Sequence, residues 1–423
     1  MPIVAQVAER LGVLPKFSDV ASLARGLEHF SEKQHNAVLT RADLPAGVRR
    51  GKRFARFTPA ARVSRYVADW YDSYIDSDLF SRERKDQFAR PKLIFAGQAP
   101  LVQVACDEDG TYLGDSLFSL TFRSELSIPY LTGILNSSLL NALFLRQNEL
   151  NAGAKPRKLE AKQLAGLPVL APRSESELKL KRFVEGNVLR LVHARQARNL
   201  IAETWRQTMR SAGCEVGSLG RALSGRPFPS GDVWAKRMMP QLTTLTRRTR
   251  KFSALICRQE PASAICRLYG RAESGDELML AEVEFADAEL AFFVAMGVAA
   301  GGDGSHRLRT IDKLLTETGL PVREDGSIES ARTFLKQALR ATARALSADR
   351  IPCAEPDINR LDQEAANLEV LVDAEVFRMY GCTWEQAAGV LSFLQASRTL
   401  SQRIETFFNR VVPQNAEQPE FLK

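Results

Sequence analysis

Residues 92–122 read KLIFAGQAPLVQVACDEDGTYLGDSLFSLTF, and this stretch decides the expected fold. Short apolar runs at 92–95, 101–106 and 117–122 have the length and the aromatic and branched side chains that are typical of strands. Asp107 to Gly110 separates them, and Asp and Gly favour turns because they tolerate the bends and the positive φ angles that turns require. We therefore expect a β-sheet in this part of the chain.

The hydrophobic period changes to that of a helix after this sheet. Residues 130–146 place their leucines on one side of a helix, so one helix is expected there. A loop with Gly and Pro follows at 153–170. Residues 177–209 then repeat apolar side chains at helical spacing, with Trp205 in the apolar stripe, over ~50 Å at 1.5 Å per residue. We expect a long spacer helix that ends before the glycines and prolines of 213–229.

The rest of the chain divides into short strands and helices. Residues 1–95 read as short strands with one helix carrying Trp70, Tyr71 and Tyr74, and 252–285 as a second, smaller β unit. Residues 287–412 read as mostly helical. The expected fold class is α+β. The expected division is a β-rich domain at 1–170, a helical spacer and linker at 171–245, and a small β unit with a helical C-terminal domain at 246–423.

Charge is distributed unevenly along the 423 residues, whose formal net charge is +8. Residues 1–175 carry 24 Lys and Arg against 19 Asp and Glu, a net of +5. Residues 176–251 carry 16 against 5, a net of +11, and residues 252–423 carry 18 against 26, a net of −8. A strongly basic middle indicates an anionic partner, with nucleic acid first, whereas the acidic C-terminal third is expected to face a protein.

Several classes of protein are not indicated by the sequence. No apolar run has the ~20 residues of a membrane helix, and the N-terminus lacks the pattern of a secretory signal. The six cysteines are scattered without a Cys-x-x-Cys pair, which is typical of buried thiols in a reducing cytoplasm. We expect a cytoplasmic protein that binds no metal and no cofactor.

The motifs of DNA-modifying and DNA-cleaving enzymes are missing or weak. The chain has no Pro-Pro dipeptide, no Gly-x-Gly-x-x-Gly turn and no phosphate-binding loop, so neither a methyltransferase centre nor an ATP-driven motor is expected. A metal-dependent nuclease places Pro-Asp before an acid-x-Lys strand. Pro356-Asp357 is present, but Glu160-Ala161-Lys162 and Glu177-Leu178-Lys179 both precede it. A stand-alone restriction endonuclease is therefore kept only as the alternative.

Three stretches together resemble one family. They are LPKFSDVASLARGLE at 14–28, the run from Arg90 through the strands above to YLTGILNSSLLN at 130–141, and LVDAEVFRMYGCT at 371–383. They are similar to the C-terminal specificity domain of TaqI-like, type IIG adenine-N6 DNA methyltransferases, whose opening strand also occurs in type I specificity subunits. The resemblance covers 14–170 and the segment near 371–385, without the methyltransferase half of the fused enzymes.

The resemblance implies a target recognition subunit without a catalytic centre. It implies double-stranded DNA as ligand and an adenine-N6 DNA methyltransferase subunit, or a methyltransferase–nuclease assembly, as partner in restriction-modification or phage defence. Arginine forks can read guanine edges, and lysines mainly hold phosphate. Basic residues cluster at Arg41–Arg65 among aromatics, at the 155–162 loop and at 246–251. The predicted DNA-binding residues are Arg49, Arg50, Lys52, Arg53, Arg56, Lys155, Arg157, Lys158, Arg247, Arg248, Arg250 and Lys251.

Overall fold

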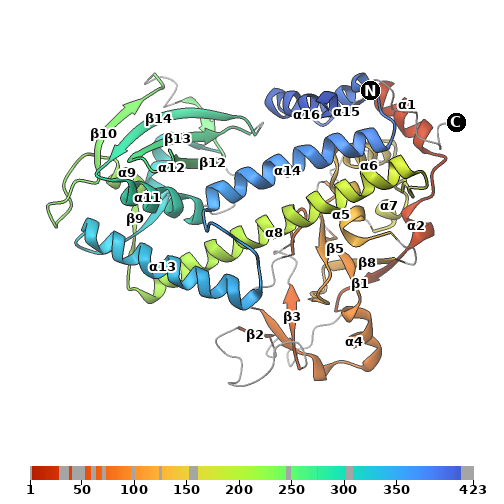
Figure 1. The fold of residues 1–423 in the computed structure, drawn as a ribbon, viewed down its shortest axis with the longest axis horizontal. Helices are drawn as coiled ribbons and strands as arrows, with labels where there is room; N and C mark the ends of the chain where they lie inside the picture. Colours follow the sequence, from red (N-terminus) through yellow and green to blue (C-terminus); the bar gives the residue numbers. More distant parts are fainter. Residues whose placement is uncertain are drawn as a thin grey trace. The chain divides into compact units, whose positions relative to one another are not determined.

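The computed structural model forms two compact units, Met1–Val192 with Ala366–Lys423 and His193–Ala365. Two helices, α8 (Glu175–Ser211) and α14 (Ile358–Met379), have residues in both units (Figure 1). The α+β class expected from the sequence is confirmed. The expected domain boundaries at residues 170 and 245 stay a prediction. The structure describes residues 2–27, 38–40, 53–58, 63–68, 73–97, 101–122, 126–151, 161–243, 249–273, 275–301 and 308–410.

The stretch 92–122 contributes three of the four strands of the larger sheet of the first unit. Its strand order is β1 (Ala21–Arg25), β8 (Leu117–Phe122), β5 (Lys92–Ala96) and β6 (Val104–Asp107), and every pair is antiparallel. The predicted opening strand at 14–28 is shorter than expected, because Phe17–Val20 forms the short helix α2 before β1 begins.

A second sheet of the first unit has the order β2 (Val38–Leu39), β4 (Tyr74–Asp76), β3 (Phe54–Thr58) and β7 (Tyr112–Leu113). The β3–β7 pair is parallel and joins segments more than 50 residues apart. The prediction that Tyr74 lies on a helix is wrong, because Tyr74 is buried in β4. Trp70 and Tyr71 lie outside the described residues.

The single helix expected at 130–146 is two helices, α5 (Ile128–Asn136) and α6 (Ser138–Asn151), at an angle of 61°. The Asn136 side chain accepts from the amide of Val104 at 3.0 Å and donates to its carbonyl at 2.8 Å. Asn136 thereby pairs with a strand backbone, and Ser137 takes extended angles that end α5. No single described helix meets the length and apolarity of a membrane span, although this bent pair does so jointly.

Helices complete the first unit. The N-terminal residues form α1 (Pro2–Leu11) rather than a strand, and the predicted helix-turn near 371–383 is confirmed. There α14 ends, Gly381 has φ +63°, and Thr383 caps the next helix reciprocally with Gln386. Arg10 donates to the carbonyl of Gly381 at 2.8 Å, which fixes α1 to this turn. The remaining helices are α4 (Arg82–Ala89), α7 (Ala161–Ala165), α15 (Trp384–Phe393) and α16 (Arg398–Arg410).

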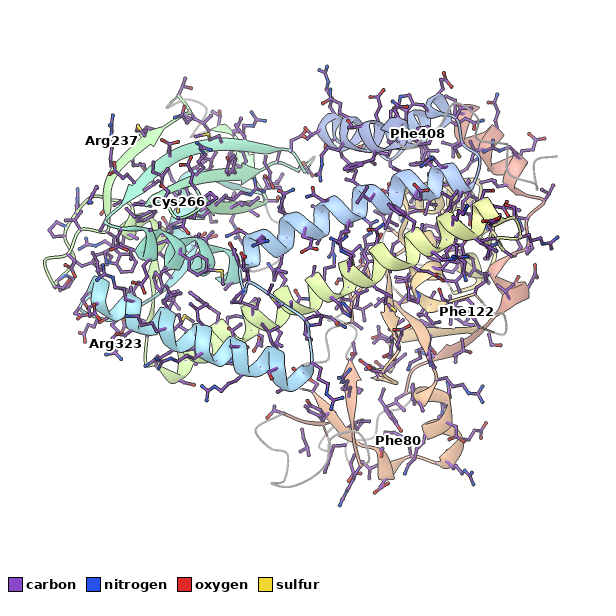
Figure 2. All side chains as sticks on the ribbon, in the orientation of Figure 1. Phe80, Phe122, Arg237, Cys266, Arg323 and Phe408 are labelled. Atoms are coloured by element: carbon purple, nitrogen blue, oxygen red, sulfur yellow. The ribbon has the colours of Figure 1, made fainter. Side chains whose placement is uncertain are left out.

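The second unit is built on an antiparallel sheet of order β10 (Ala235–Pro240), β14 (Glu277–Phe285), β13 (Ile265–Arg271) and β12 (Ala254–Gln259). The β unit expected at 252–285 is present, and β10 joins it at one edge. Helix α11 (Ala288–Gly301) packs on this sheet (Figure 1). Cys266 lies in the sheet (Figure 2), and its thiol donates to the carbonyl of Ala291 on α11 at 3.4 Å.

Aromatic side chains form the core of the second unit beside that sheet. Trp205 packs against Phe293 and Phe334 with ring centroids 5.9 and 5.1 Å apart, which confirms the apolar stripe expected on the long helix. Trp234 packs on Phe293 and donates its indole N–H to the carbonyl of Gly326 at 2.8 Å. The remaining elements are β9 (Glu215–Ser218), α9 (Leu219–Ala222), β11 (Lys251–Phe252), β15 (Arg309–Thr310), α12 (Ile311–Glu317), β16 (Gly319–Val322) and α13 (Ile328–Asp349).

Candidate nucleic-acid interface

Strand β3 and the residue before it carry two of the predicted DNA-binding arginines, Arg53 and Arg56. Phe54 and Phe57 of the same strand are buried, and Phe57 belongs to a hydrophobic cluster with Ile75 and Phe88. The arginines are thus attached to a packed strand, although their side chains reach solvent: that of Arg53 is 60% exposed and that of Arg56 is 28% exposed. A strand fixed by its core holds such groups more precisely than a loop does.

Arg53 is oriented by an aspartate on the neighbouring strand. Its Nε and Nη2 atoms donate to one carboxylate oxygen of Asp76 at 3.0 and 2.9 Å, and its guanidinium lies 5.4 Å from the Phe54 ring centroid. The hydrogen bond from Arg53 to Asp76 raises the pKa of Arg53. Partial burial acts to raise the pKa of Asp76, but bonds from Arg53 and from the Asp78 amide outweigh it, so this pKa lies below its ordinary value.

Arg56 forms an ion pair with Asp109, in the turn between β6 and β7. Asp107 fixes that turn by accepting hydrogen bonds from the amide and hydroxyl of Thr111 at 2.9 and 3.0 Å. Asp107 is itself paired at 2.6 Å with Lys92, whose side chain is 0% exposed. A buried pair supported by further hydrogen bonds fixes geometry strongly, so Lys92 positions the turn that holds Arg56.

Helix α4 brings further basic side chains to this region, and the sequence reasoning missed them. Lys85 pairs with Asp78 at 2.8 Å, and the same carboxylate lies 3.9 Å from Arg53. Arg82 and Arg84 precede Lys85 in the same helix, which Ser81 caps through the amide of Arg84. The signal was present as the run Arg-Glu-Arg-Lys at 82–85, but the acids within and around it lowered its local net charge.

Arg65 closes the basic segment of 41–65 and has a structural role. It donates to the carbonyl of Asn136 at the end of α5 and lies 4.0 Å from Glu369 on α14. Nearby, Asp373 accepts from the amide and hydroxyl of Ser138 at 2.7 Å each, at the start of α6. Burial raises the pKa of Asp373, opposed by the charge of Arg65 and the bonds from Ser138.

The other predicted residues divide into two groups. Arg250 and Lys251 belong to the second unit, where the Arg250 guanidinium lies 5.9 Å from the Phe252 ring centroid and Lys251 begins β11. Arg56 lies on β3, and Arg53 directly precedes it. The DNA contacts expected of the other residues stay predictions. The predicted residues outside the described part of the chain are Arg49, Arg50, Lys52, Lys155, Arg157, Lys158, Arg247 and Arg248.

Two of the acids that suggested a nuclease lie at helix starts, whereas Glu160 lies outside the described residues. Asp357 accepts from the amide of Asn359 at 2.9 Å at the start of α14. Glu177 accepts from the amides of Arg173 and Ser174 at 2.8 and 3.0 Å at the start of α8. Among the described residues, no group of three or more His, Cys, Asp or Glu side chains could hold a metal ion. These contacts explain the two acids without catalysis.

A sheet domain that presents oriented arginines defines a candidate nucleic-acid-binding protein. Residues 60–169 match the family model of the TaqI-like C-terminal specificity domain. The match includes α4, Lys92 and the turn at Asp109, and it begins directly after β3.

Solved structures are similar to the chain over most of its length. The type I restriction-modification S subunit from M. genitalium is 11% identical over 86% of this chain and 94% of its own, with a TM-score of 0.37. The HsdS subunit from Thermoanaerobacter tengcongensis is 13% identical over 86% and 95%, with a TM-score of 0.28. No curated protein matches the chain.

Proposed function

We propose that the chain is a sequence-specific double-stranded DNA-binding subunit without a catalytic centre. It would supply target choice to a restriction-modification or phage-defence methyltransferase system. The observation that carries the proposal is the TaqI-like C-terminal specificity domain at residues 60–169. The guanidinium groups of the exposed Arg53 and the half-buried Arg56, beside that domain, supply the forked donors that read base edges in the major groove.

The ion pairs that Arg53 and Arg56 make with aspartates favour sequence-specific DNA binding over general DNA binding. Each must exchange an aspartate for DNA, so binding is favourable only where the new partner matches the geometry of the guanidinium fork. An unrelated duplex offers phosphate oxygens but no matching base edge. We therefore assign Arg53 and Arg56 to base contacts, and the predicted residues Arg250 and Lys251 to phosphate contacts.

Selection from a random duplex library tests the function directly. We expect the full chain to enrich a short defined motif, with affinity falling steeply as salt rises, because phosphate contacts release counterions. Salt-sensitive binding without any motif would instead indicate a protein that binds DNA non-specifically. Binding that is absent even at low salt would refute the autonomous reader.

The partner follows from the missing chemistry. Because the sequence lacks the loops of a methyltransferase, we propose that an adenine-N6 DNA methyltransferase subunit binds this chain and modifies the motif that it selects. The test adds the purified chain to such a subunit and measures methyl transfer to duplexes with and without the motif. Methylation that ignores the motif would contradict this assignment. No observation favours the nuclease alternative.

A further inference from the structure

Helix α13 of the second unit has one buried face and one basic face. Its buried face consists of Ala331, Phe334, Leu335, Ala338, Thr342 and Leu346. On the opposite side, Lys336, Arg340 and Arg344 are exposed and follow one another at intervals of four residues. Side chains at this spacing lie on one line along a helix, here over ~12 Å at 1.5 Å per residue. We name these three residues the α13 basic stripe.

The α13 basic stripe lacks the acids that normally accompany such charges. Residues 330–348 contain no Asp or Glu. Among the described residues, Lys336 and Arg340 have no ion-pair partner, and Arg344 donates only to the carbonyl of Arg340 at 3.4 Å. Like charges four residues apart destabilise a helix by ~0.2–0.5 kcal/mol per pair. The alanines of α13 have the highest helix propensity and offset this repulsion.

Several other cations of the second unit are paired with carboxylates, unlike those of the stripe. Arg332 on the same helix lies 2.6 Å from Asp287 and 3.5 Å from Glu289. On α8, which the sequence marks as basic, Arg206 pairs with Glu203 at 3.0 Å and Arg198 with Asp362 at 3.2 Å. Among the described residues, no carboxylate pairs with the stripe, although it lies within the third of the chain whose net charge is −8.

The composition of the exposed face selects the partner. Around the stripe lie Thr333, Gln337, Ala343, Ser347 and Ala348, all exposed and none a large apolar side chain. A protein-binding face is expected to have an apolar or aromatic centre and few lysines. Small neighbours instead allow a sugar–phosphate backbone to come close, and aligned cations neutralise successive phosphates.

We propose that the α13 basic stripe binds the phosphate backbone of duplex DNA, independently of its sequence. The proposal rests on the proposed function, since it adds a second contact to the DNA that the specificity domain selects. It assigns DNA contact to the C-terminal third, for which the net charge predicts a protein partner.

A charge-matched pair of variants of the full chain tests the stripe. The stripe variant combines Lys336→Gln, Arg340→Gln and Arg344→Gln. The control variant combines Lys179→Gln, Lys313→Gln and Arg360→Gln, which removes the same charge from exposed side chains that each have an acidic partner. Fluorescence anisotropy measures affinity for the selected motif and for an unrelated duplex across a salt series, and circular dichroism checks that both variants fold.

We expect the stripe variant to weaken binding to both duplexes by the same factor. Each lost phosphate contact lowers the slope of log affinity against log salt by ~0.9, so three lower it by ~2.7. Between about 50 and about 200 mM salt, wild-type affinity would then fall ~40-fold more than that of the stripe variant. The control variant should keep a slope close to that of the wild type.

Other outcomes separate this proposal from the proposed function. If the stripe variant has the slope and affinity of the control while motif enrichment persists, the stripe proposal is overturned and the proposed function stands. Poly-L-glutamate serves as a second probe: loss of its binding without loss of duplex binding would assign the stripe to an acidic protein and overturn the proposal. A wild-type chain that binds no duplex at low salt would refute both.

Discussion

The arginines of β3 and the α13 basic stripe hold their charge in opposite ways. Arg53 and Arg56 each donate to an aspartate that is fixed by its own hydrogen bonds. Lys336 and Arg340 have no such partner among the described residues. A paired guanidinium is oriented and must be released before it binds, whereas an unpaired cation accepts any phosphate. If both proposals hold, local clusters of positive charge indicate a nucleic-acid surface, and ion pairing separates selective contacts from general ones.

The largest effect is expected at the most enclosed ion pair. Replacing Lys92 by Met leaves Asp107 buried without its cation, 2.6 Å from where the ammonium was, which costs ~3–5 kcal/mol of unfolding free energy. Urea unfolding followed by circular dichroism measures it. The matched control is Lys85→Met, which breaks an exposed pair with Asp78 and costs at most ~1 kcal/mol. Equal losses in the two variants would contradict the role given to Lys92.

The next effect tests whether a paired arginine is selective. Arg56→Ala should lower affinity for the selected motif by ~5- to ~150-fold, corresponding to the ~1–3 kcal/mol of a bidentate base contact. Binding to an unrelated duplex should change much less. Arg56→Lys keeps the charge but removes the fork, so it should lose the preference for the motif and retain the salt slope. If Arg56→Ala weakens both duplexes equally, Arg56 is a phosphate contact like the stripe.

A smaller effect is expected when a paired arginine is converted into an unpaired one. Asp76→Asn removes the carboxylate that holds Arg53, so Arg53 becomes available to any phosphate. The salt slope for an unrelated duplex should steepen by up to ~0.9, and preference for the motif should fall. Asp86→Asn on α4 is the control, because Asp86 is exposed and has no ion pair among the described residues. The same steepening in the control would show that net charge alone is responsible.

The fold was predictable where local pattern decides it. The apolar repeat of 177–209 predicts α8 to within two residues at each end. The short apolar runs of 92–122 predict β5, β6 and β8 of the larger sheet, although β6 begins three residues later than the expected strand at 101–106. The polar run Asn136-Ser137-Ser138 interrupts the apolar pattern and indicates capping or a contact with the preceding sheet, but the sequence does not show that Asn136 binds the backbone of Val104, 32 residues away. Strand β10 was missed because its basic residues and final proline are typical of a loop, although an edge strand tolerates proline.

The candidate site was predictable as charge but not as pairing. The basic cluster at 41–65 indicates DNA, yet nothing local in it shows that Arg53 is held by Asp76 or that Arg65 reaches Glu369. Those partners come close only in the folded chain, where β4 brings Asp76 to Arg53 and α14 brings Glu369 to Arg65. The α13 basic stripe was hidden for another reason: averaging over an acidic third of the chain conceals a short segment that contains no acid.

The smallest effect concerns the pH dependence of two aspartates that both lie near an arginine. The pKa of Asp76 is lowered, because bonds from Arg53 and the Asp78 amide outweigh the effect of burial. Its contribution to stability is present above the ordinary pKa of Asp and is lost as pH falls through the lowered value. The pKa of Asp373 is raised, because burial outweighs the charge of Arg65. Its contribution is present below the ordinary pKa and is lost as pH rises through the raised value.

The two asparagine variants should therefore diverge from the wild type in opposite directions. As pH rises from about 4 to about 7, across and above the ordinary Asp range, the stability of wild type relative to Asp373→Asn should decrease. Below the ordinary Asp pKa of about 3.9, the stability of wild type relative to Asp76→Asn should increase as pH rises. Urea unfolding at a series of pH values measures both differences. Parallel curves would mean that Arg65 neutralises Asp373 as completely as Arg53 neutralises Asp76. Burial of Asp373 would then make no difference to how its charge is balanced by the neighbouring arginine.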